Sequence, residues 1–177
     1  MCINFSACAS TSSDRAIKSS NSDKSDLLSQ QETNNFLYSE SQSSSDDSIF
    51  ITDIESPKGF TKIIKNEKLY IYDSNGNSLI ASNEKKYDNF SSLEKKDYAK
   101  ILGSNFSNVK LLDFNKTSVI GNNAIRIKFE STKKDEKFLN LCYYLDCENN
   151  GIKILIQAKT DKILNDLEET IGTIELD

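Results

Sequence analysis

The stretch KFLNLCYYLDCENNGIKILIQAK, residues 137–159, decides the fold. It contains two runs, LNLCYYL and IKILIQA, in which apolar side chains occur at both alternating sets of positions, so both faces of each strand are apolar. A strand of this kind has to be covered on both sides. Residues 148–151 separate the two runs and form a connection short enough to join antiparallel neighbours. The stretch therefore predicts the doubly buried centre of an antiparallel sheet.

Other strand-like runs precede this centre. They are SIFITDI, GFTKII, KLYIYD, SLIASNEK, NVKLLDFNKTSVI and NAIRIKFES, which begin at residues 48, 59, 68, 78, 108 and 123. Asn75 and Gly76 lie between the third and fourth runs, and both residue types tolerate positive φ, so they predict a hairpin turn. The other connections are also short, which indicates an antiparallel meander.

Between these strands, residues 91–106 change to a helical period. The apolar residues Leu93, Tyr98, Ile101 and Leu102 fall on one helical face. Ser91 stands three residues before Glu94, which is the spacing of a capping box. Gly103 is a helix-stop signal.

A second helix is predicted at the end of the chain. Thr160 is a capping residue, and an apolar stripe follows it at Ile163, Leu164, Leu167 and Ile171. The order of strands, helix, four strands and helix predicts the α+β class: a twisted antiparallel sheet of about six or seven strands, covered by helices on both faces as an α/β/α sandwich.

The N-terminal 47 residues have a different composition. They carry 14 serines, three basic residues and seven acidic residues, with few apolar side chains. Such a segment cannot bury enough apolar surface to offset its ordering entropy. The sequence therefore predicts a disordered Ser-rich tail or linker over residues 1–47 and a folded domain over residues 48–177.

The folded part resembles the PsbP/Mog1-like α/β/α sandwich over about residues 50–177. The matching features are the SPKGF turn, the KLYIYD and SLIAS hairpin, the helix SSLEKKDYAKIL, the long run KLLDFNKTSVIGNNAIRIKF, the hairpin of residues 137–159 and the helix DKILNDLEETIGTI. Small proteins of this kind attached to Gram-positive membranes look like the nearest relatives. The resemblance implies binding and assembly and brings no catalytic residues.

Phe5, Ser6, Ala7 and Cys8 resemble a bacterial lipobox, in which small residues precede a lipid-modified cysteine. The resemblance implies a diacylglyceryl group on the Cys8 sulfur and a serine-rich spacer behind it. Phe5 replaces the usual aliphatic residue, and only four residues precede the box, so this prediction requires a start further upstream or a trimmed chain. The alternative is an exposed thiol, which is also the interpretation for Cys2.

Composition limits the chemistry of the chain. It has no histidine, which removes the commonest general base and metal ligand. Neither the tail nor the domain has the basic excess that nucleic-acid binding needs. Twenty lysines and only two arginines, Arg15 and Arg126, indicate AT-rich codon usage. We therefore predict no nucleic-acid partner, no cofactor, no metal site and no catalytic residues.

Several patterns imitate a site. Asp73, Asn75, Asn77 and Glu84 have the spacing of calcium ligands in an EF-hand loop, but Ser78 occupies the position that needs glycine, which favours a solvated hairpin turn. The acidic pairs 146/148 and 168/169 alternate with lysine and asparagine, as solvated faces do. The lysine pairs at 85–86, 95–96 and 133–134 are expected to keep turns and helix faces soluble.

Cysteines and tyrosines in the strands favour core positions over sites. Cys142 and Cys147 are five residues apart, an odd separation that places their side chains on opposite faces and favours two buried thiols over a disulfide. Tyr70, Tyr72, Tyr143 and Tyr144 could line a groove, but strand tyrosines more often pack against a helix.

These patterns favour a non-catalytic binding or assembly domain on the outer face of the cell membrane, anchored by a lipid on Cys8. Its partner would be an unidentified protein or cell-envelope component. The alternative is a soluble intracellular, cytoplasmic protein-binding adaptor of the same fold. No run of about 18 apolar residues predicts a membrane span. No ligand-binding residues can be chosen from the sequence.

Overall fold

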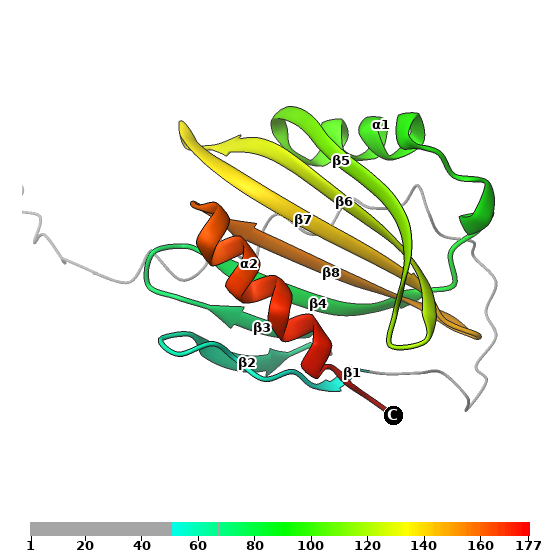
Figure 1. Ribbon diagram of the computed structural model, residues 1–177, viewed down its shortest axis with the longest axis horizontal. Coiled ribbons are helices and arrows are strands. Elements are labelled where there is room, and N and C mark those ends of the chain that lie inside the picture. The colour runs from blue at the N-terminus through cyan, green and yellow to red at the C-terminus, as the bar shows by residue number, and fades with distance from the viewer. Residues whose placement is uncertain (1–50, 67) are drawn as a thin grey trace, which may run out of the picture. The chain divides into compact units, whose positions relative to one another are not determined.

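The computed structural model describes residues 51–66 and 68–177, which contain a seven-stranded antiparallel sheet (Figure 1). Its strands are β2 (Thr61–Lys65), β3 (Lys68–Tyr72), β4 (Ser78–Lys85), β5 (Ser107–Val119), β6 (Asn122–Lys133), β7 (Glu136–Asp146) and β8 (Asn150–Ala158). Their spatial order is β2-β3-β4-β8-β7-β6-β5. The sheet thus joins two meanders, β2 to β4 and β5 to β8, through the antiparallel pairing of β4 with β8. The predicted tail, Cys2 and Cys8 lie outside the described residues.

The predicted position of residues 137–159 at the centre of the sheet is confirmed, but the expected burial of both faces holds for β7 alone, because Lys153, Leu155 and Gln157 on one face of β8 are half-buried. β8 lies between β4 and β7, and residues 137–159 form the hairpin of β7 and β8. Leu141 and Leu145 belong to the apolar cluster on one face, whereas Cys142 and Tyr144 belong to the cluster on the other. Both faces of β7 are therefore buried, as the double set of apolar side chains requires.

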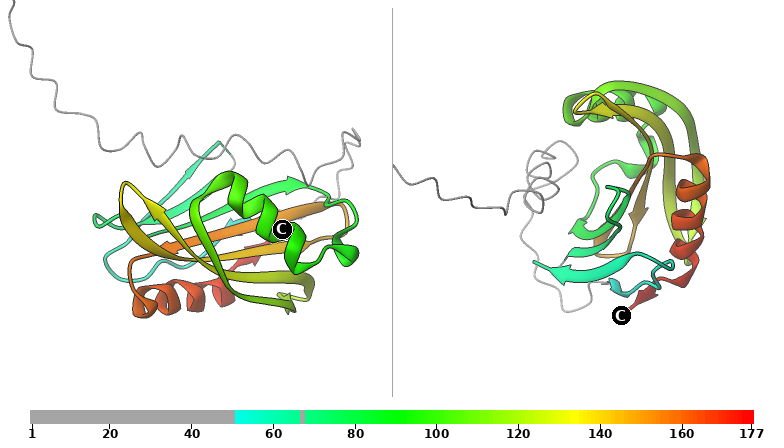
Figure 2. Two further views of the ribbon diagram at one scale, coloured as in Figure 1. Left: turned by 90° about the horizontal axis from the view of Figure 1, so that it is seen from above. Right: turned by 90° about the vertical axis from the view of Figure 1, so that its left-hand side faces the viewer.

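Two helices pack on this sheet, and each contributes to a different apolar cluster. α2 (Asp161–Glu169) contacts β7 and β8 and buries Leu164 and Leu167. α1 (Lys95–Asn105) contacts β5 and buries Tyr98, Ile101 and Leu102. Figure 2 shows how short both helices are beside the curved sheet. Each helix lies over only part of the sheet, so the expected cover of both faces by helices is not confirmed.

The described residues of the run SIFITDI pair outside the main sheet. Its described part forms β1 (Ile51–Asp53), which pairs with β9 (Glu175–Leu176) in a separate two-stranded sheet. β9 follows α2 and the 3₁₀ turn η2 (Thr170–Thr173). The partner of β1 is therefore the C-terminal end of the chain. A pattern in sequence shows that a segment is extended, but it does not identify a partner so far away.

The predicted capping box of α1 is displaced by three residues. Ser91 lies in a separate 3₁₀ turn, η1 (Phe90–Ser92), and Glu94 is itself the N-cap of α1. The Glu94 amide donates to Asp97 Oδ2 at 2.9 Å, and the Glu94 carboxylate accepts from the backbone at Asp97. The capping box is thus formed by Glu94 and Asp97, in place of the predicted Ser91 and Glu94, and it satisfies free amides in the first turn of α1.

Gly103 does not end α1, contrary to the sequence prediction. The helix continues to Asn105, where the Asn105 side-chain amide donates to the Ile101 carbonyl at 2.8 Å and the Phe106 amide donates to the Leu102 carbonyl at 2.9 Å. These bonds satisfy carbonyl groups of the last turn, and no glycine with positive φ is needed there.

Gly151 is required for close packing at the start of β8. A Cβ at this position would lie 2.6 Å from Cε2 and Cζ of Tyr87 and 2.9 Å from the carbonyl oxygen of Lys85. We expect Gly151→Ala to lower the free energy of unfolding by about 1–3 kcal/mol, because Tyr87 is buried and a backbone oxygen blocks the other side. Urea titration measures this change.

The matched control is Gly103→Ala. Gly103 lies inside α1, and nothing lies within 4 Å of a Cβ there. This variant should gain about 0.5–1 kcal/mol from helix propensity. Equal stabilities for the two variants would contradict the packing at Gly151.

Candidate functional site

The most connected group of polar side chains surrounds Arg126 on β6. Arg126 Nε donates to Glu168 Oε1 at 2.8 Å, and Nη2 donates to Glu168 Oε2 at 3.2 Å. Nη1 donates to Asp113 Oδ2 at 3.0 Å. Tyr143 Oη accepts from Arg126 Nε at 3.1 Å and donates to Glu168 Oε1 at 2.6 Å. We call Arg126, Glu168, Tyr143 and Asp113 the arginine cluster.

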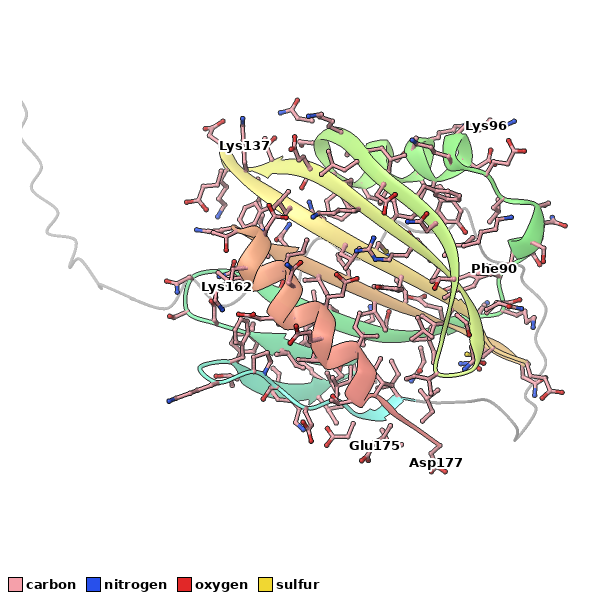
Figure 3. All side chains as sticks on the ribbon, viewed as in Figure 1. Phe90, Lys96, Lys137, Lys162, Glu175 and Asp177 are labelled. Carbon is pink, nitrogen blue, oxygen red and sulfur yellow. The ribbon has the colours of Figure 1, made fainter. Side chains whose placement is uncertain are left out.

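Sheet register explains how distant residues meet in the arginine cluster. Arg126 pairs with Tyr143 of β7 and Asn115 of β5, so all three face the same side of the sheet. Glu168 comes from α2, which lies over that side (Figure 3, with Lys162 near the start of α2). The guanidinium thus joins the helix to two strands, and its planar fork matches the two carboxylate oxygens of Glu168.

The arginine cluster favours the charged forms of Arg126 and Glu168 and the neutral form of Tyr143. Hydrogen bonding to Glu168 raises the pKa of Arg126. Burial raises the pKa of Tyr143 to about 12, and the Glu168 carboxylate adds to this effect. Burial opposes the charged form of Glu168, but hydrogen bonds from Arg126 and Tyr143 outweigh it, so the pKa of Glu168 lies below its ordinary value. None of these shifts brings a proton-exchanging group towards pH 7, where a general acid or base has to titrate.

The arrangement therefore supports a structural tie better than a reaction. The prediction that Glu168 lies on a solvated face is wrong: its side chain is 26% exposed and bound at both oxygens. One signal could have found the cluster. In a chain with twenty lysines, Arg126 is the only arginine outside the predicted tail, which indicates a position that needs the guanidinium fork.

The other patterns with the spacing of a site prove to be structural. Asp73 Oδ1 accepts from the amides of Asn75 and Asn77 at 2.8 and 2.9 Å, so the calcium-like sequence is a hairpin turn, as expected. Within residues 51–66 and 68–177, no three His, Cys, Asp or Glu side chains gather in a group that could hold a metal ion. Cys142 and Cys147 are free and buried, as predicted, and burial raises the pKa of both thiols.

Tyrosines and lysines also follow the structural interpretation in most cases. Tyr70, Tyr143 and Tyr144 are buried, in agreement with core roles, and Tyr72 is half-buried. Lys86 does more than keep a turn soluble. Its Nζ donates to the carbonyls of Cys147 and Glu148 at 2.6 and 2.8 Å and thereby holds the β7–β8 turn.

Exposed apolar side chains identify a different candidate surface. Among the described residues, the large hydrophobic side chains that are exposed are Ile63 (40%), Ile64 (64%), Leu112 (38%) and Ile120 (43%). Two of them are adjacent on β2, and every residue of β2 is exposed. β2 is an outer strand of the described sheet. We call the side of β2 that faces away from β3 the β2 edge.

Only the comparison with solved structures finds similar proteins; no family model and no curated protein matches the chain. The chain is similar to LpqN of Mycobacterium tuberculosis, a protein involved in cell envelope biogenesis, with 13% identity and a TM-score of 0.48 over 75% of this chain and 85% of LpqN. It is also similar to cyanobacterial PsbP (CyanoP) of Synechocystis sp. PCC 6803, with 10% identity and a TM-score of 0.48 over 77% of this chain and 98% of CyanoP.

A Pseudomonas aeruginosa protein of unknown function is similar at 8% identity and a TM-score of 0.45, over 66% of this chain and 96% of that one. The resemblance to PsbP noted in the sequence thus recurs among the structural neighbours. The described residues contain no helix long and apolar enough to cross a membrane. Function has to be inferred from the chain's own residues.

The arginine cluster predicts a pH-dependent stability. Because the pKa of Glu168 is lower in the folded protein than its ordinary value of 4.5, its carboxylate stabilises the fold above pH 4.5. This contribution is lost as the pH falls through the folded pKa. We expect Glu168→Gln to lower the free energy of unfolding at pH 7 by about 1–2 kcal/mol and to flatten the loss of stability below pH 4.5. Urea titrations at several pH values measure both effects.

The neighbouring Glu169→Gln is the control, because Glu169 is exposed. It should change the free energy of unfolding by less than about 0.5 kcal/mol. If the two variants have the same stability and the same pH profile, the arginine cluster does not hold α2 on the sheet.

Proposed function

We propose that this protein is a non-catalytic docking module, held at the outer face of the cell membrane by a lipid on Cys8, that binds a protein or cell-envelope partner. The observation that carries the docking role is a contrast between two groups of side chains. The arginine cluster is satisfied by its own members, whereas exposed apolar side chains lie on an outer strand. Ile63 and Ile64 are adjacent on β2 and point to opposite faces of the sheet, so both faces of this outer strand offer apolar surface to a partner.

A catalytic role has little support from the described residues. An acid–base site needs a group with a pKa shifted towards neutrality, facing a substrate. Glu168 and Tyr143, the strongest candidates, shift away from neutrality and bind Arg126. Binding of a partner through a preformed surface therefore explains these features better than catalysis does.

Support for the membrane anchor comes from the sequence FSAC at residues 5–8 and the serine-rich stretch behind it. In this proposal, small residues before Cys8 fit a signal peptidase, the Cys8 sulfur carries the lipid, and residues 10–47 act as a spacer. The alternative adaptor inside the cell would use the same domain without the lipid. The two proposals can be told apart by whether the Cys8 sulfur carries a lipid.

Metabolic labelling with an alkyne fatty acid in the natural host tests the anchor. The full-length protein from its own gene should take up the label. The Cys8→Ser variant should take up no label and should no longer be found in the membrane fraction. Cys2→Ser is the matched control and should keep the label, since the residue directly before Cys2 is Met1 and not a small residue. An unlabelled wild-type protein, or a labelled Cys8→Ser variant, would remove the anchor and favour the adaptor.

A further inference from the structure

We propose that the β2 edge binds an extended acidic peptide, which adds to the sheet as an eighth strand beside β2. This inference rests on the proposed docking function and names its surface and its partner. In an antiparallel pair only alternate residues exchange backbone hydrogen bonds, so the remaining N–H and C=O groups of β2 point away from β3. An added strand can bind these groups, as in other domains that take a peptide at a sheet edge.

Side chains on the β2 edge provide apolar contacts on both faces. Ile63 pairs with Tyr70, and Ile64 pairs with Leu69, so the two isoleucines end two rows of side chains that cross the sheet. Tyr70 and Leu69 are buried, but Ile63 and Ile64 are 40% and 64% exposed. A strand added beside β2 would cover both isoleucines and continue both rows.

Charge determines which strand fits. Residues 57–65 contain Lys58, Lys62 and Lys65 and no acidic residue. Lys62 forms an ion pair with Asp53 at 2.5 Å, whereas Lys58 and Lys65 have no ion pair with any described residue. A basic partner would meet like charges, and an acidic partner would meet opposite ones.

A second copy of this chain fits the β2 edge less well for the same reason. Antiparallel pairing of two β2 strands would bring Lys62 and Lys65 of both copies together. Lysines on an edge strand are a common means of preventing such association. The charge that opposes a second copy favours an acidic peptide.

Position by position, the β2 edge specifies a short pattern. Apolar residues are expected opposite Ile63 and Ile64, and an acidic residue opposite Lys65. An acidic residue opposite Lys62 would share this lysine with Asp53. The pattern acidic–apolar–apolar–acidic reads the same in both directions, so it holds for a parallel or an antiparallel strand.

Fluorescence anisotropy tests the inference with the full-length protein. The probe is a fluorescein-labelled peptide with the core glutamate–valine–valine–glutamate, and the comparison peptide has lysine in place of both glutamates. We expect saturable binding of the acidic peptide, weaker binding at high salt, and at least about tenfold weaker binding of the basic peptide. Hydrogen exchange should show new protection at residues 61–65.

Ile64→Asp should weaken binding of the acidic peptide by about tenfold or more, because it places a like charge at the centre of the edge. Leu112→Asp is the matched control: Leu112 is 38% exposed on β5, the opposite outer strand, and its replacement should leave binding unchanged. Lys65→Glu should weaken the acidic peptide and strengthen the basic one. This exchange of preference would show a direct contact, which a folding defect cannot imitate.

The inference would be overturned by no binding up to about 1 mM peptide, by equal binding of Ile64→Asp and wild type, or by a wild-type dimer in sedimentation that Ile64→Asp dissociates. The last result would assign the β2 edge to a second copy. Peptide protection at another surface would keep the docking function and remove only the β2 edge. An unlabelled wild-type protein in the fatty-acid experiment would remove only the proposed anchor and would leave the peptide-binding inference standing.

Discussion

Burial of β7 on both faces, together with the fully buried face of β8 beside it, is the constraint on which the rest of the structure depends. Leu141 pairs with Ile156, and Cys142 pairs with Leu155, so the two strands contribute neighbouring rows to both apolar clusters. Each fully buried aliphatic side chain contributes about 1.5–3 kcal/mol, and this pair of strands supplies such side chains to both clusters. α2 and the strands on either side bury these rows of side chains and thereby shield them from water.

The same constraint explains why the ends of the sheet differ from its centre. Cover decreases with distance from β8, and at β2 every side chain is exposed. An outer strand that kept two adjacent isoleucines without a use for them would risk association with other chains. Lys62 and Lys65, which flank Ile63 and Ile64 on β2, reduce that risk and at the same time favour an acidic partner.

Local features of the fold could be predicted from the sequence, and long-range ones could not. The two-sided burial of β7, the hairpin turn at Asn75–Gly76 and the Thr160 cap each depend on residues close in sequence, and the structure confirms them, with a positive φ at Gly76 alone in the turn. The pairing of β1 with β9 joins the two ends of the domain, and no pattern within either segment identifies the other.

Both candidate sites show the same limit. The arginine cluster contains one residue from each of β5, β6, β7 and α2, so its members form no motif in the sequence. Only the rarity of arginine could have indicated Arg126. GFTKII was recognised as a strand, but its position at an edge follows from the order of all seven strands. The exposure of Ile63 and Ile64 is a property of that order and not of the local sequence.

Native-state hydrogen exchange of the free protein tests the central claim most directly. If the central β7–β8 hairpin supports an open edge at β2, amides of β7 and β8 should exchange only through global unfolding, and amides at residues 61–65 should exchange fastest among the seven strands. Slow exchange at β2 equal to that of β8, or fast local exchange within β7 and β8, would contradict the account.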